Sequence, residues 1–77
     1  MEAYVLIQTE VGRAEVVARQ IAALPGVLSA DDVTGPYDVV VKVGAAESDA
    51  MQEVVAVVQG VDGITRTLTC PIAGASH

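Results

Sequence analysis

The side chains that most often carry chemistry are scarce in this sequence of 77 residues, which has one histidine and one cysteine. His77 is the last residue, and chain ends fray, so the fixed geometry of a general base or a metal ligand is not expected there. Cys70 has no base in a recognisable relation to it and is interpreted as a small packed hydrophobic residue rather than a nucleophile. The sequence therefore predicts no catalytic residue, no metal site and no cofactor.

Four further residues also have ordinary structural interpretations. Asp31 and Asp32 occupy consecutive positions of an expected strand, so their carboxylates point to opposite faces and cannot share a proton. Arg66 is interpreted as a surface residue of the last strand, and Met51 as part of the apolar stripe of a helix. Neither a Walker A motif nor a dinucleotide-binding glycine motif is present.

One segment differs from the rest, the run Val-Thr-Gly-Pro-Tyr-Asp at residues 33–38. Gly35 and Pro36 predict a sharp turn into a valine-rich strand, with Tyr37 and Asp38 at its start. A carboxylate beside buried valines is costly unless it is paired or lies at the rim. Two interpretations stay open. Asp38 bonds nearby amides of a strand-connecting turn, or the turn amides hold a ligand carboxylate while Asp38 faces the ligand's ammonium group.

The elements that position this turn follow from the spacing of apolar residues. Short apolar runs predict strands, and apolar residues three and four apart predict helices. The expected elements are strand 3–9, helix 12–24, strand 27–33, strand 37–43, helix 47–59 and strand 64–70. This β-α-β-β-α-β order is typical of the ferredoxin-like α+β fold, a four-stranded antiparallel sheet with two helices on one face and the first and third strands in the middle. Residues 1–77 are expected to form one domain, with residues 73–77 as a flexible tail.

The other face of such a sheet has nothing in the chain to cover it. Alternation places Tyr4, Leu6 and Val40 on that face, and in the last strand it places Ile64 on the same face as Arg66. An open apolar face on a chain too small to bury a large core predicts self-association. The simplest cover is a second copy, in a two-fold dimer packed sheet against sheet.

Composition excludes several classes of partner. Four basic residues against ten acidic ones give a net charge of −6, and binding to nucleic-acid phosphates requires clustered Lys and Arg. No apolar run is long enough to cross a membrane. The first residues lack the basic region of a signal peptide, so we expect a cytoplasmic protein with no direct contact to nucleic acid or membrane.

Gly35-Pro36-Tyr37-Asp38 matches the Gly-x-Tyr-Asp motif of the effector-binding domain of Lrp/AsnC transcriptional regulators, also called the RAM domain. Residues 4–7 are similar to the opening strand of that family, and residues 24–27 to its first helix-to-strand corner. Val33 and Thr34 precede the motif as they do in the family, and residues 61–69 are similar to its closing corner and strand. The sequence thus resembles this domain from residue 3 to about residue 72.

The resemblance implies face-to-face dimers that assemble into a higher oligomer and bind an amino acid or related metabolite between dimers. Family regulators carry a helix-turn-helix domain ahead of this one, whereas this sequence begins at the first strand. We therefore expect a stand-alone effector domain with a regulatory role. Pro36 occupies the variable motif position and has no amide hydrogen to donate. The residues that correspond to the family's effector site are Val33, Thr34, Gly35, Tyr37, Asp38, Thr67 and Thr69.

Two other functions share this fold. One is an interaction module that co-assembles with full-length Lrp/AsnC regulators. The other is a small enzyme of the dimeric α+β barrel type, which usually needs His, Trp, Asn or an acid pair between the helices and the sheet. The sequence contains no Trp, Asn or Phe, and its inward positions are valines and alanines. This composition favours a protein that is not an enzyme.

Overall fold

The computed structural model describes residues 1–73 of the chain. Its elements are, in order, β1 (Glu2–Thr9), α1 (Ala14–Ala22), β2 (Val27–Asp32), β3 (Val39–Gly44), α2 (Ser48–Gln59) and β4 (Ile64–Pro71). The predicted β-α-β-β-α-β order is confirmed, with element ends displaced by no more than two residues. Residues 74–77, which include His77 and nearly all of the predicted tail, lie outside the described residues.

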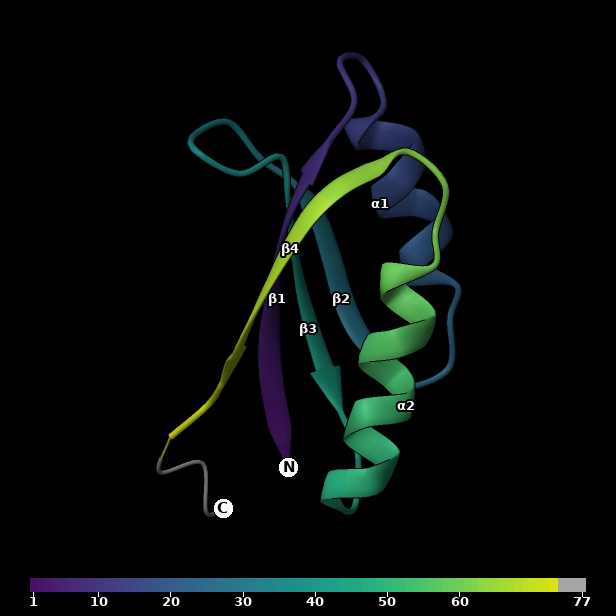
Figure 1. Cartoon of the computed structure of the whole chain (residues 1–77), viewed down its shortest axis with the longest axis vertical. Coiled ribbons are helices and arrows are strands. Elements are labelled where there is room, and N and C mark those ends of the chain that lie inside the picture. Colours follow the sequence, from purple (N-terminus) through teal and green to yellow (C-terminus); the bar gives the residue numbers. More distant parts are fainter. Residues whose placement is uncertain (74–77) are drawn as a thin grey trace.

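The four strands form one antiparallel sheet in the order β2-β3-β1-β4. The first and third strands are therefore central, as the ferredoxin-like pattern predicts. Both helices lie on the same face of this sheet (Figure 1). Within residues 1–73, neither helix combines the length and the hydropathy that a membrane-spanning helix requires.

The core lies between the helices and the sheet and consists of small branched side chains. The two helices contribute to it unequally, because α1 buries three residues and α2 only Val58. Met51, Val54 and Val55 of α2 face the core but stay partly exposed. The fully buried set is Ala3, Val5, Ile7, Val17, Ala18, Ile21, Val39, Val41, Val43 and Val58. The first two turns of α2 thus cover the sheet less closely than α1 does.

The two helix-to-strand corners are built alike, each around a glycine with a positive φ. Gly26 follows α1 with φ of 87°, and Gly63 follows α2 with φ of 97°. A Cβ at Gly26 would lie 2.5 Å from Cγ2 of Val54. The first corner therefore needs glycine both for its backbone conformation and for the close approach of α2.

The opposite face of the sheet is covered by no other described element. Tyr4 pairs with Lys42 and Cys70, and Leu6 pairs with Val40 and Leu68, so these side chains share that face. Tyr4 is 41% exposed and Leu68 is 44% exposed. We call this surface the open face; it comprises the even-numbered residues of β1 and β3, Arg66, Leu68 and Cys70 of β4, and Leu28, Ser29 and Asp31 of β2.

A break in the strand register overturns one prediction about β4. Gln8 pairs with Arg66, but the next residue, Thr9, pairs with Ile64, so Thr65 is left as an extra residue opposite this step. Ile64 consequently packs against the buried core instead of sharing a face with Arg66. The prediction was wrong because strict alternation assumes an unbroken register, which a β-bulge interrupts.

Candidate functional site

The turn between β2 and β3, residues 33–38, is closed and anchored by backbone hydrogen bonds. The amide of Val33 donates to the carbonyl of Asp38 at 2.8 Å, and the amide of Asp38 donates to the carbonyl of Ile7 at 2.8 Å. The side-chain nitrogen of Gln8 donates to the carbonyl of Pro36 at 3.0 Å. The turn is thus held against the end of β1.

The Asp38 carboxylate has a defined structural partner. Its Oδ2 accepts a hydrogen bond of 2.8 Å from the backbone amide of Thr9. This bond ties the end of β1 to the start of β3 and satisfies one carboxylate oxygen with a charge-assisted bond. Within residues 1–73, Oδ1 accepts no hydrogen bond. The interpretation that Asp38 accepts a bond from a nearby amide therefore holds for Oδ2 and leaves the role of Oδ1 open.

The turn also presents backbone donors that the described part of the chain does not use. The amides of Thr34, Gly35 and Tyr37 donate no hydrogen bond to any of residues 1–73. Thr34 and Gly35 are exposed, and Gly35 has φ of 150°, a conformation that favours glycine. The arrangement provides amide donors for an external anion beside a carboxylate that can accept from a cation.

The structure brings five of the seven predicted effector residues together, on or at the end of this turn. Thr67 and Thr69 are apart from it, because β4 is separated from β3 by β1, a distance of about 10 Å between strands. Thr67 and Thr69 pair with Ile7 and Val5 and therefore face the helices. The hydroxyl of Thr67 already accepts a hydrogen bond of 3.0 Å from the side chain of Gln59.

One residue with a structural interpretation behaves differently from expectation. Cys70 is exposed on the open face rather than packed, because it pairs with Tyr4 on the side of the sheet without helices. Met51 lies on the core-facing stripe of α2 as predicted, where it is partly buried and also lines a cavity. Among residues 1–73, no cluster of three or more His, Cys, Asp or Glu could hold a metal ion.

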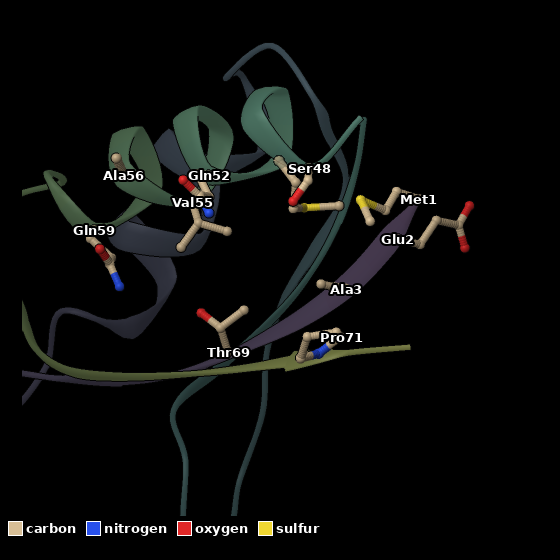
Figure 2. A pocket seen from close by; sticks show the side chains of 11 residues that line it. Met1, Glu2, Ala3, Ser48, Gln52, Val55, Ala56, Gln59, Thr69 and Pro71 are labelled. Carbon is tan, nitrogen blue, oxygen red and sulfur yellow. The ribbon is translucent and has the colours of Figure 1, made fainter. Parts of the chain in front are cut away.

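That cavity, of about 340 Å³, lies between α2 and the sheet and was not predicted (Figure 2). It is at the end of β1 opposite to the turn, since Met1, Glu2 and Ala3 line it. Its other lining residues come from α2 and from the end of β4, where Thr69 contributes a wall. The sequence feature that corresponds to the cavity is the small size of Ala3 and Thr69, which face the apolar stripe of α2.

The turn, the open face and the element order together agree with one family. The model of the Lrp/AsnC ligand binding domain matches residues 2–73. The chain belongs to this family. A curated relative, homocitrate synthase of Sulfurisphaera tokodaii, is 32% identical over 53 residues, which are 69% of this chain and 12% of the enzyme. The chain therefore spans a small part of that relative.

Solved structures of several other proteins share the fold. A crystal structure of TTHA0845 from Thermus thermophilus is 33% identical in sequence and has a TM-score of 0.84. The match covers 92% of this chain and 90% of the T. thermophilus chain. AsnC of E. coli has a TM-score of 0.85 at 23% identity, over 99% of this chain and 52% of AsnC. The Neisseria meningitidis transcriptional regulator NMB0573, solved as its L-Met complex, has a TM-score of 0.79 at 16% identity, over 99% of this chain and 51% of that protein.

Proposed function

We propose that this Lrp/AsnC ligand-binding domain senses an amino acid or a related small metabolite at the turn formed by residues 33–38, and that it has a regulatory role. The observation that carries the proposal is the set of unused amides of Thr34, Gly35 and Tyr37 beside the free Oδ1 of Asp38, all within the described residues 1–73. The L-Met complex of the N. meningitidis regulator supports an amino acid as the ligand class.

The proposed contacts follow from the charges of an amino-acid zwitterion. Its carboxylate accepts from the turn amides, and its ammonium group donates to Oδ1 of Asp38. Asp38 can do both tasks because Thr9 uses only Oδ2. The bond from Gln8 to the carbonyl of Pro36 fixes the turn before the ligand arrives, which lowers the cost of ordering it. Val33 borders the turn amides and Asp38. Thr67 and Thr69 are too far from the turn of their own chain, so they would contact the ligand only if they belonged to a neighbouring copy.

The same proposal includes a homodimer formed through the open face. The charged residues on that face are Glu2, Asp31, Lys42 and Arg66, two acidic and two basic, so the net charge of −6 lies elsewhere on the chain. Lys42 lies 3.4 Å from Glu2 and 5.9 Å from the centre of the Tyr4 ring. A neutral, apolar face on an acidic molecule favours contact between two open faces over other contacts between copies.

Assembly of dimers into a higher oligomer would place further copies beside the turn. A ligand that prefers the assembled state shifts the assembly equilibrium toward it. Ligand binding would then change the surface offered to partners, including full-length Lrp/AsnC regulators, in a cytoplasmic setting without direct contact to nucleic acid or membrane.

The experiment is calorimetry of the protein with each of the standard amino acids, followed by variants of Asp38 with the ligand found. Asp38→Asn keeps an oxygen for the Thr9 amide but removes the negative charge, so we expect folding to be retained and affinity to fall by about tenfold or more. Asp32→Asn, on the exposed edge strand β2, is the matched control and should bind as the parent does. Equal affinity of the Asp38→Asn protein would refute the proposed site.

A second candidate function is favoured by the match to homocitrate synthase. A stretch of this metabolic enzyme is similar to the chain, so the regulated partner could be an enzyme instead of a transcriptional regulator. The two candidates share the same ligand site and differ in the partner. Co-purification of this protein from its own cells, with and without the amino acid found by calorimetry, distinguishes an associated enzyme from an associated regulator.

A further inference from the structure

The cavity between α2 and the sheet is separate from the turn, and no residue of the turn lines it. We propose that it is a second binding site, for a small uncharged aliphatic molecule that carries a neutral hydrogen-bonding group such as an amide or a hydroxyl. This proposal goes beyond effector binding at the turn and does not depend on it.

Size is the first argument. The cavity volume of about 340 Å³ lies in the lower part of the range of small-molecule pockets. Native interiors rarely leave voids larger than a water molecule. Here the hollow exists because Ala3 and Thr69 on the sheet are too short to fill the space beneath Met51 and Val55 of α2. These two α2 residues remain partly exposed although they belong to the core-facing stripe, so an apolar guest would complete their burial.

The charges of the lining decide the class of guest. Among the described residues, no Lys, Arg or His side chain lines the cavity, and the positive charge nearest to it on a lining residue is the terminal ammonium of Met1, a residue that is 63% exposed. A carboxylate or phosphate would therefore enter without a buried counter-ion. Glu2 is the only residue of the described lining with a charged side chain, and its carboxylate points away from the hollow (Figure 2) and pairs with Lys42. No aromatic ring from residues 1–73 lines the walls, so stacking of a flat ring is not offered. An uncharged, flexible aliphatic chain fits these walls, and methionine side chains adapt to its shape.

Neutral polar groups border the same hollow. Figure 2 shows the side chains of Gln52 and Gln59 extending from α2 toward the sheet and the Thr69 side chain rising from β4. The amide of Gln59 is engaged with Thr67, whereas Gln52 and the Thr69 hydroxyl form no side-chain hydrogen bond within residues 1–73. These two groups can donate to and accept from one neutral polar head.

The probe is hexanamide, titrated into the isotopically labelled full chain and followed by ¹H–¹⁵N spectra. We expect saturable shifts at residues 1–3, 48–59 and 69–71 and none at residues 33–38. Hexanoate has the same carbon chain with a carboxylate and should bind about tenfold more weakly or worse. The Asp38→Asn protein should bind hexanamide unchanged, which separates failure of this site from failure of the turn site.

Two variants and one matched control test the location. Thr69→Leu places extra bulk in the cavity and should weaken hexanamide by about tenfold or more. Thr65→Leu makes the same change elsewhere on β4 and should not. Gln52→Leu changes an exposed residue, keeps the fold and should weaken hexanamide several-fold through loss of its amide. The proposal is overturned if the cavity residues do not shift, if hexanoate binds equally well, or if Thr69→Leu and Gln52→Leu both bind as the parent does. If a second copy of the chain covered the cavity, hexanamide could not enter and the cavity residues would not shift.

Discussion

Replacement of Gly26 by alanine should destabilise the domain through two separable effects. The φ of 87° costs an L-residue about 1–2 kcal/mol. The new Cβ would also lie 2.5 Å from Cγ2 of Val54, so α2 or the corner must move, and such overpacking costs about 1–3 kcal/mol. The expected total is about 2–5 kcal/mol, out of the roughly 4–12 kcal/mol typical of a domain of this length.

Gly12→Ala separates the two effects, because Gly12 has φ of 80° but a Cβ there would meet nothing within 4 Å. It should cost about 1–2 kcal/mol, the backbone effect alone. In the Gly26→Ala background, Val54→Ala removes the clashing methyl groups, so the double variant should be more stable than the sum of the single changes predicts, by about 1 kcal/mol.

The measurement is urea-induced unfolding at one fixed protein concentration, since stability of an oligomer depends on concentration. The reasoning is refuted if Gly26→Ala and Gly12→Ala cost the same, or if the costs at Gly26 and Val54 simply add. Equal costs at Gly26 and Gly12 would mean that α2 moves to accommodate the new Cβ without a measurable loss of stability. Additive costs at Gly26 and Val54 would mean that the Val54 side chain does not clash with that Cβ.

The remaining predictions concern the open face, the core and the surface. Leu68→Lys puts a charge in the proposed dimer interface and should halve the mass measured by sedimentation, whereas Val57→Lys on exposed α2 should not; a dimer that survives Leu68→Lys contradicts the interface. Ile7→Val removes one fully buried methylene and should cost about 1 kcal/mol by urea unfolding, and a cost near zero would mean that the core collapses around the gap. Arg19→Ala breaks the exposed 2.8 Å pair with Glu15 and should cost less than about 0.5 kcal/mol at any salt concentration; a larger, salt-dependent loss would show that the pair is not a simple surface pair.

The order of the elements and the central position of β1 and β3 could be predicted because both depend on local patterns. Valines and an isoleucine occupy the inward positions of both strands, and Tyr4, Leu6 and Val40 make the outward positions largely apolar as well. The pattern also identifies the open face, since two helices can cover only one side. The β-bulge could not be predicted in the same way, because no glycine or proline marks Thr65 as the residue where the register shifts.

The sequence did not predict the contacts that side chains make with residues far away in the chain. The motif located Asp38, but its bond to the Thr9 amide depends on β1 and β3 lying side by side, which a local pattern does not specify. The cavity depends on the distance of α2 from the sheet, and that distance reflects the sizes of Ala3 and Thr69 on two different strands.

The position of β1 restricts how a ligand at the turn could act on the rest of the domain. Its odd-numbered residues, such as Val5, fill the core, its even-numbered residues, such as Leu6, form the open face, and its end accepts and donates bonds to the turn. A slip of β1 by one residue would exchange the two faces and expose the buried valines, so the strand cannot shift register in response to a ligand. We therefore expect that a ligand at the turn acts on the contacts between copies of the chain in the proposed assembly. In the dimer proposed above, in which the open face is directed at a second copy, assembly is the property that such contacts can change with the least rearrangement inside each copy.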